Sequence, residues 1–337
     1  MTLHTLGSQF QYPAPDMKKI KKNRDELHYK IRTLGTIYLP VLGEQLTSLL
    51  NEINAIDDQA LRTLTLLPTV LPISEIQRFH TTIENMKLEP STPDQEEAIA
   101  SFYQEINSLI ESGTSEVSKL ATGLNNNLVN LKAVTLSDNQ YRIKEIEASI
   151  SNISPNISAE EKAIEKLEKD ESELNTAIKL IEATDTFELI KELLLTAEKL
   201  AGLNLSAPQV ELVKAGLAVA GKLLNLISDK IKYGNLIDAR RQIQERLDDR
   251  RQNLARINQD VKNLQDRKNQ LVEFQSAQTP REIYTNEIST LVDAIYKFLE
   301  INEHSAADDF SSVVKRFIEQ SNIFITHLNN LRQEWRS

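Results

Sequence analysis

The sequence predicts an all-α protein: an elongated rod of long coiled-coil helices, with a helical-bundle tail and an apolar helical hairpin as a head at its tip. Three observations predict this fold. Glycine and proline number only 9 and 10 among 337 residues, and aromatic residues make up 5%. Leu, Ile, Glu, Lys, Asn and Gln dominate, which favours helices over sheets. Several long stretches repeat apolar residues three and four positions apart, whereas none alternates with period two.

The amino-terminal part predicts a tail followed by short bundle helices. Residues 1–15 contain two prolines and are expected to form a flexible tail. Helices are expected to begin at Pro15 and at about Pro40. Residues 62–74 are apolar but contain two further prolines, which predicts a buried connector, and Ser74 is expected to cap the next short helix.

Three heptad seams predict long helices, and at ~1.5 Å per residue a 40-residue helix reaches about 60 Å. Inside the second seam Pro155 predicts a kink or short break, because Ser158 and Glu161 form an S-x-x-E capping box. The heptad phase continues across Pro155, which favours a kink over a reversal. The first seam holds Ile99, Tyr103, Ile106, Ile110, Gly113, Val117, Leu120, Leu124, Asn127, Leu131 and Val134. The second holds Ile143, Ile146, Ile150, Ile153, Ile157, Ile164, Leu167, Leu174, Ile178 and Ile181, and the third Leu236, Ile243, Leu247, Leu254, Ile257, Val261, Leu264 and Leu271.

The carboxy-terminal part predicts two more bundle helices. Thr279-Pro280-Arg281-Glu282 has the pattern of a capping box with proline at the first helical position. A last helix is expected from about Ala306 to Trp335, the only tryptophan, which could anchor a partner or a lipid surface but more simply packs against the amino-terminal helices. We therefore expect four segments: the tail 1–15, the tail-bundle helices and ascending arm 16–183, the head 184–233, and the returning arm with the last bundle helices 234–337.

The head is predicted as a hairpin of two helices, Phe187–Ala201 and 207 to about 232, joined by a turn at Gly202–Pro208. Ser206 and Gln209 form an S-x-x-Q cap for the second helix. Residues 187–231 carry five acids and five lysines, so their net charge is zero in a chain of −10.

A helical wheel of the second head helix separates a polar stripe from a wide apolar face. Lys230 lies outside the stripe and could extend its ammonium group to water at the helix end. Gly216 and Ala220, four apart, would let another backbone approach closely. The stripe is about 80° wide at ~100° per residue and consists of Glu211, Lys214, Ala218, Lys222, Asn225 and Asp229.

Two interpretations of this helix follow from its energetics. A helix of about 39 Å could cross a hydrocarbon core of ~30 Å. A single copy should not insert, because each Lys or Asp near mid-membrane costs ~2.5–3.5 kcal/mol. In a ring of copies the stripe would face water and the apolar face would meet lipid. The alternative is an ordinary buried helix in an all-α core.

Several other classes of function find no support in the sequence. The formal charge of −10 argues against nucleic acid as the main partner. The chain has no cysteine, its five histidines are scattered, and it contains no nucleotide-binding glycine motif, so we expect neither an enzyme, a metal site nor a cofactor. The first residues contain no apolar stretch typical of a secretory signal peptide, so we expect a soluble product.

The layout of short helices, heptad arm, apolar hairpin (FELIKELLLTAEKLAGLNLSAPQVELVKAGLAVAGKLLNLISDKI) and charged return arm resembles the cytolysin A superfamily of α-pore-forming toxins. It looks most like the B components of the two-part XaxAB/YaxAB cytotoxins. The resemblance covers about residues 17–335 and rests on architecture and the head.

The resemblance implies a soluble monomer that is released without a classical signal peptide. It implies that the monomer joins an A-component partner in a ring-shaped hetero-oligomer at a target-cell membrane and inserts its head hairpin into the lipid. The stripe residues would then line the pore. The apolar residues expected to enter lipid are Phe187, Leu189, Leu193, Leu194, Leu200, Leu203, Leu205, Leu212, Val213, Leu217, Val219, Leu223, Leu224, Leu226, Ile227 and Ile231. The alternative, from another class, is a non-enzymatic coiled-coil scaffold with a buried apolar hairpin.

Overall fold

The computed structural model describes residues 10–34, 38–90, 92–227, 230–304 and 309–336. These residues are helical apart from their connections and one isolated β-bridge, which confirms the all-α class. The chain divides into two compact units. Unit 1 is Met1–Asn139 with Gln270–Ser337, and unit 2 is Gln140–Asn269.

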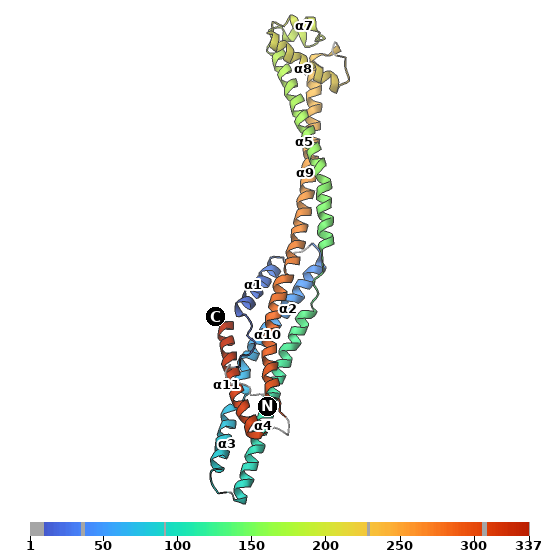
Figure 1. The fold of residues 1–337 in the computed structure, drawn as a ribbon. Coiled ribbons are helices and arrows are strands. Elements are labelled where there is room, and N and C mark those ends of the chain that lie inside the picture. Colours follow the sequence, from blue (N-terminus) through green and yellow to red (C-terminus); the bar gives the residue numbers. More distant parts are fainter. Residues whose placement is uncertain (1–9, 35–37, 91, 228–229, 305–308, 337) are drawn as a thin grey trace, which may run out of the picture. The chain divides into compact units, whose positions relative to one another are not determined.

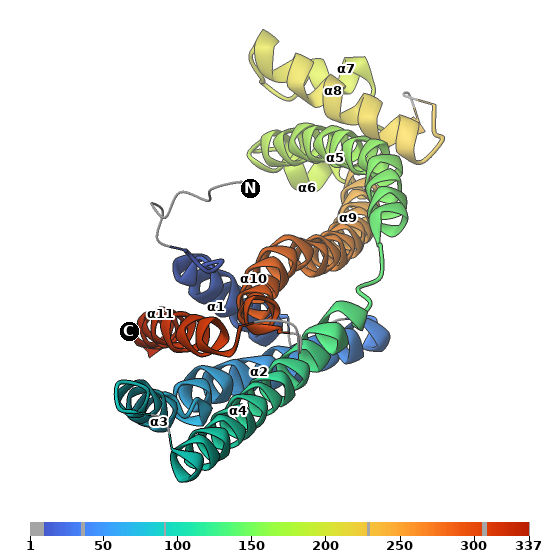
Figure 2. The ribbon, with the colours of Figure 1, turned by 60° about the horizontal axis from the view of Figure 1, so that its bottom comes forward.

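Unit 1 is a helical bundle (Figure 1). In it α2 packs against α4, α10 packs against α1 and α4, and α11 packs against α2, α3 and α10, as the view along the bundle in Figure 2 shows. Its helices are α1 Met17–Thr33, α2 Pro40–Val70, α3 Ile73–Met86, α4 Pro93–Ala133, α10 Gln278–Asn302 and α11 Phe310–Arg336.

The seam predicted for residues 99–134 is the buried face of α4. Thr92 caps this helix by accepting a hydrogen bond from the amide of Gln95, whose side chain bonds back to the amide of Thr92. Two expected positions are replaced by their neighbours, since Ala121 and Leu128 are buried where Leu120 and Asn127 were predicted. The buried seam is Ile106, Ile110, Gly113, Val117, Ala121, Leu124, Leu128 and Leu131.

Of the two prolines in the predicted connector, residues 62–74, only Pro72 lies between helices. Helix α2 continues through Pro68 to Val70, and Pro72 rather than Ser74 is the N-cap of α3. An internal proline removes one helical hydrogen bond and crowds the preceding turn. The neighbouring Leu64 and Leu67 are completely buried, so tertiary packing outweighs the local penalty.

The capping box predicted at residues 279–282 does not form either. Ala277 alone separates α9 from α10, and its backbone is in the α region. Its amide donates to the carbonyl of Phe274, and the amide of Arg281 donates to the carbonyl of Ala277, so the chain needs no capping side chain there. Trp335 is buried, which agrees with a packing role. The last helix was expected to begin at about Ala306, but residues 306–308 lie outside the described residues.

Residues 10–15, expected as the end of a flexible tail, pack onto unit 1. Tyr12 is buried, its hydroxyl donates to Oε1 of Gln320 at 2.9 Å, and its ring lies 5.0 Å from that of Phe324. The side chain of Asp16 then caps α1 by accepting hydrogen bonds from the backbone amides of Lys18 and Lys19. Residues 1–9 lie outside the described residues.

Unit 2 contains α5 Gln140–Glu182, the segment that follows it, and the part of α9 (Tyr233–Ser276) up to residue 269. Helices α5 and α9 run antiparallel, joined by ion pairs Glu160–Arg250 at 2.7 Å, Glu168–Arg251 at 2.7 Å and Glu147–Lys268 at 3.0 Å. Pro155 lies inside α5, which continues past it, so the alternative of a short break is wrong and, as expected, the described chain does not reverse there.

The predicted segment boundaries at 183 and 234 do not coincide with the division of the chain. Residues 184–233 belong to the same compact unit as both arms, because α8 packs along α5. The division falls instead at the irregular residues 134–139 and, on the return, between residues 269 and 270.

Candidate functional site: the apolar head

The head, which we define as residues 187–232, is not a simple hairpin of two long helices. Its first predicted helix is divided into α6, Phe187–Ile190, and α7, Ala197–Ala201. The turn then leads to α8, Ala207–Leu223, where the amide of Ser206 donates to Oε1 of Gln209 at 2.8 Å as the cap predicts. Helix α8 has 17 residues, so the predicted continuation to residue 232 is wrong.

A left-handed residue ends α8. Asn225 has φ of +52°, and the amide of Leu226 donates to the carbonyl of Gly221 at 2.8 Å. This six-to-one bond across a left-handed asparagine is the Schellman arrangement, which closes a helix by satisfying its last carbonyls. The chain then turns back, and Ile231 reaches the interior with no exposed surface.

A short strand-like contact holds the beginning and the end of the head together. Leu194 and Lys232 form an antiparallel bridge, and the amide of Leu195 donates to the carbonyl of Ile231 at 2.8 Å. Beside it the Tyr233 ring meets that of Phe187 edge-on at 5.0 Å, and its hydroxyl donates to Glu182. Burial and the Glu182 carboxylate raise the pKa of Tyr233 to about 12, so the phenol keeps its proton and remains a donor even in mildly alkaline solution.

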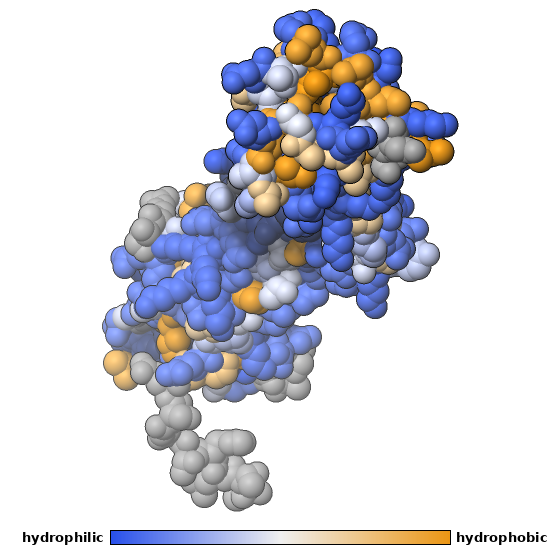
Figure 3. Space-filling view, turned by 90° about the horizontal axis from the view of Figure 1, so that it is seen from above, coloured by the Kyte–Doolittle hydropathy of each residue, from blue (hydrophilic) through white to orange (hydrophobic). Residues whose placement is uncertain are grey.

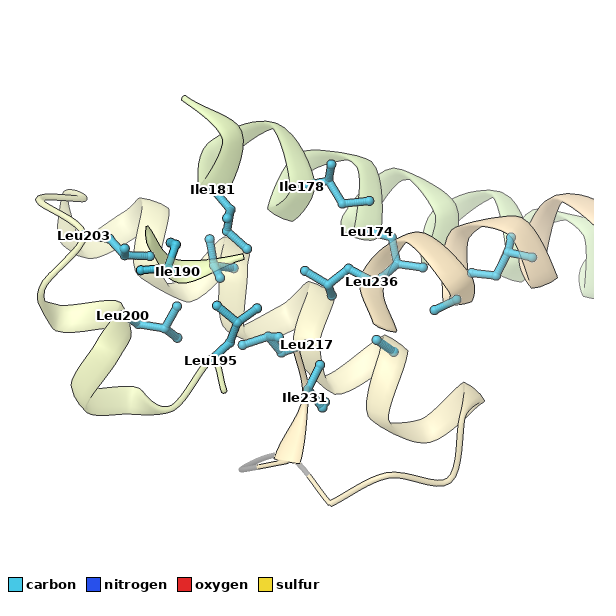
Figure 4. Close-up of a cluster of buried hydrophobic side chains, with 14 of the residues drawn as sticks. Leu174, Ile178, Ile181, Ile190, Leu195, Leu200, Leu203, Leu217, Ile231 and Leu236 are labelled. Carbon is cyan, nitrogen blue, oxygen red and sulfur yellow. The ribbon is translucent and has the colours of Figure 1, made fainter. Parts of the chain in front are cut away.

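The interior of the head is one apolar cluster built from every element of unit 2. Figure 4 shows side chains from α5, the α6–α7 segment, α8 and α9 pointing toward one another. Leu195 and Leu200 are 2% exposed, and Ile181 and Leu236 are completely buried. Burying a Leu or Ile side chain contributes about 1.5–3 kcal/mol, so the cluster holds the head against α5 and α9.

Helix α8 lies very close to α5 at Gly216. A Cβ placed on Gly216 would collide with the Cβ of Ala177, and it would lie 3.1 Å from the carbonyl oxygen of Glu173. Ala220, one turn further along α8, is completely buried. The close backbone approach expected at Gly216 and Ala220 is thus made by α5 at Gly216.

The apolar residues predicted to enter lipid divide into three groups. Figure 3 shows apolar surface over the head, and its exposed side chains are Leu189 at 75%, Leu193 and Leu194 at 41%, Leu212 at 46% and Ile227 at 62%. Buried are Leu200, Leu203, Val213, Leu217 and Ile231. Partly buried against the cluster are Phe187, Leu205, Val219, Leu223, Leu224 and Leu226.

The predicted polar stripe is only partly on α8. Glu211, Lys214, Ala218 and Lys222 lie on this helix and are exposed, and Lys214 pairs with Glu211 at 2.9 Å. Asn225 lies beyond the helix end, and Asp229 lies outside the described residues. Lys230, the residue that fits the wheel least well, is exposed on the returning chain.

Sequence reasoning missed the residues that hold the head in place. Ile190 and Leu195 belong to the buried cluster, but the apolar set predicted for the head does not include them, although both lie in apolar runs. Leu174, Ile178 and Ile181 of α5 were assigned to a coiled-coil seam, yet they pack against head residues. Only the fold shows that the two sets share one core.

Among the described residues, none of the helices has a stretch both long and apolar enough to cross a membrane. The same residues contain no group of three or more His, Asp or Glu side chains placed to hold a metal ion.

Several solved structures share this fold at low sequence identity. The chain is similar to PaxB from Photorhabdus luminescens, with a TM-score of 0.83 and 18% identity over 97% of this chain and 99% of that one. It is similar to XaxB from Xenorhabdus nematophila, with a TM-score of 0.81 and 16% identity over 96% and 99%. Against a chain of the YaxAB pore complex the TM-score is 0.67, at 18% identity over 96% and 100%. No protein-family model matches the sequence, and no curated protein matches it.

Proposed function

We propose that this chain is the B-type subunit of a two-component α-helical pore-forming toxin. It assembles with an A-component partner into a ring at a target-cell membrane, and its head leaves α5 and enters the lipid. The observation that carries the proposal is the head: a largely apolar segment with a net charge of only +1, held by one cluster, with five large apolar side chains exposed on it.

The comparisons support this proposal through the fold. The likeness covers nearly the whole of this chain and of PaxB and XaxB. The chain also matches a chain of the XaxAB pore complex, but with a TM-score of 0.69 against 0.81 for XaxB by itself. We infer that the structure represents the arrangement before insertion.

The packing of the head suggests how insertion would proceed. In this arrangement the polar stripe of α8 and Leu212 face water, while Val213, Leu217 and Val219 pack in the cluster. Leaving α5 exposes apolar area that only lipid or neighbouring subunits can cover again. Straightening the chain beyond Leu223 would lengthen α8 toward the ~20 residues that a hydrocarbon core requires.

Dye leakage from vesicles tests the proposed function. Liposomes loaded with carboxyfluorescein receive this chain, an A-type partner from the same organism, or both. We expect little leakage with either protein alone and rapid leakage with both, together with lysis of erythrocytes. Intact vesicles and cells under all three conditions would instead favour a coiled-coil scaffold.

A further inference from the structure

A groove runs along one side of α8 and is closed by α5 and α9, within unit 2. It encloses about 650 Å³. Its apolar lining comes from α5 and α8 alone and consists of Ala163, Leu167, Ala215, Ala218, Val219 and Leu223.

Four cationic side chains from three helices line the same groove. Lys166 belongs to α5, Lys222 to α8, and Arg246 and Arg250 to successive turns of α9. Arg250 already pairs with Glu160 at 2.7 Å. In the part of the chain that the structure describes, the other three form no ion pair within 4 Å.

Two acidic side chains also line the groove, so its lining charge is +2 rather than +4, and +1 when Glu160, the partner of Arg250, is included. Asp170 and Glu173 both lie on α5, and among the described residues neither forms an ion pair with the cations opposite. Like charges gathered on neighbouring helices repel one another, and a bound anion relieves that repulsion. The groove therefore combines a surplus of cations with an apolar floor.

We propose that this groove binds an anionic amphiphile with a single alkyl chain and a phosphate or carboxylate head. The head group lies between Lys222 and Arg246, where it accepts charge-assisted hydrogen bonds. The alkyl chain lies along Leu167, Val219 and Leu223 and covers apolar surface that water now meets. A volume of this size suits one small ligand.

Binding also stabilises the packing of α8 on α5. Lys166 and Leu167 lie on α5, whereas Lys222 and Val219 lie on α8, so the complete site exists only while the two helices are together. A ligand that binds only this arrangement favours it by mass action. This binding does not depend on insertion into a membrane, so it can be tested whether or not the chain forms pores.

Binding to the purified chain tests the proposal. Decyl phosphate and decanoate are titrated below their micelle concentrations. Inorganic phosphate tests binding of the anionic group alone, and decyl maltoside tests binding of the alkyl group alone. We expect both anionic amphiphiles to bind at least about tenfold more tightly than either control probe. Hydrogen exchange of the α8 amides should slow when decyl phosphate is bound, and circular dichroism verifies that the protein stays folded.

A charge-matched pair of variants identifies the site. Replacing both Lys222→Gln and Arg246→Gln should weaken decyl phosphate binding about tenfold or more. Replacing Lys169→Gln and Lys179→Gln, two exposed lysines of α5 outside the groove, removes the same charge and should leave binding unchanged. Equal weakening in both double variants, absence of binding, or inorganic phosphate binding as tightly as decyl phosphate would each overturn the proposal.

Discussion

Gly216 of α8 lies so close to Ala177 of α5 that no side chain fits between the two helices. A glycine inside a helix usually costs about 0.5–1 kcal/mol relative to alanine. Here the cost is offset because the missing Cβ lets α8 rest directly on α5. The contact makes the attachment of the head to its arm sensitive to a single methyl group.

Gly216→Ala should therefore destabilise unit 2, against the usual effect of alanine in a helix. Overpacking of this kind costs about 1–3 kcal/mol, and we expect a lower free energy of unfolding in urea and faster hydrogen exchange along α8. Gly43→Ala is the matched control, because a Cβ on Gly43 in α2 meets nothing within 4 Å. That control should be neutral or stabilising; a stabilised Gly216→Ala protein would contradict the contact.

Leu212→Asp should abolish leakage while leaving the isolated chain folded. Leu212 is 46% exposed on α8, so an aspartate there costs little in water, but a charge in the hydrocarbon costs about 2.5–3.5 kcal/mol per copy. Thermal unfolding checks the fold and dye leakage checks the function. Val129→Asp, at a 53% exposed position on α4 in unit 1, should leak like the wild type. Unchanged leakage of Leu212→Asp would show that this face of α8 does not meet lipid.

His327 should make unit 1 less stable in mild acid. Burial beside the ring of Tyr12 lowers its pKa below the ordinary value of 6.5, so the folded state binds the proton less readily than the unfolded state. The contribution of neutral His327 to the free energy of unfolding is complete above pH 6.5. It is lost as the pH falls from 6.5 through the lowered pKa of the folded state. Urea unfolding at pH 7.5 and pH 5.0 should show a larger loss for the wild type than for His327→Gln. An equal loss of unfolding free energy in both proteins would show that His327 does not cause the instability in acid.

Most of the fold can be predicted from the sequence because helix patterns and heptad seams depend on residues close together in the chain. The seam of α4 follows from spacing, apart from Ala121 and Leu128, which are buried in place of Leu120 and Asn127. The error at Pro68 arises because a proline penalty is a local energy, which tertiary packing can exceed.

The head was harder to predict because its decisive contacts join distant residues. The wheel treats residues 207–232 as one helix, since nothing in their apolar pattern changes at Leu223. Asn225 was the available sign, because asparagine tolerates the left-handed conformation that ends a helix. No pattern in the sequence predicts the bridge between Leu194 and Lys232.

Tyr284→Phe should destabilise unit 1 by about 1–3 kcal/mol, the cost of leaving a buried acceptor without its donor. The Tyr284 hydroxyl donates to Oδ1 of Asp57 at 2.6 Å, and Arg24 approaches the other carboxylate oxygen at 3.6 Å. Burial raises the pKa of Asp57, so the carboxylate depends on both partners. Tyr296→Phe, at a 39% exposed position, is the control and should change the unfolding midpoint little. Equal stability of the two variants would refute the role of this bond.

A reversible cross-link across the head tests the central claim most directly. Leu194 and Lys232 oppose each other in the bridge, where Cα atoms of such a pair are about 4.5–5.5 Å apart, within the range that a disulfide spans. The chain has no cysteine of its own. In an extended two-helix hairpin the same residues would be separated by about 25 Å along the axis. A disulfide between Leu194→Cys and Lys232→Cys therefore fits the described head but not an extended one.

The decisive measurement is the rate of dye leakage caused by the Leu194→Cys, Lys232→Cys chain with its A-type partner, before and after reduction with dithiothreitol. The two single-cysteine chains serve as controls. The proposed rearrangement predicts no leakage from the oxidised protein and recovery of the wild-type rate on reduction. Full leakage from the oxidised, verified cross-linked protein would contradict it, because the head would then perforate membranes without separating Leu194 from Lys232.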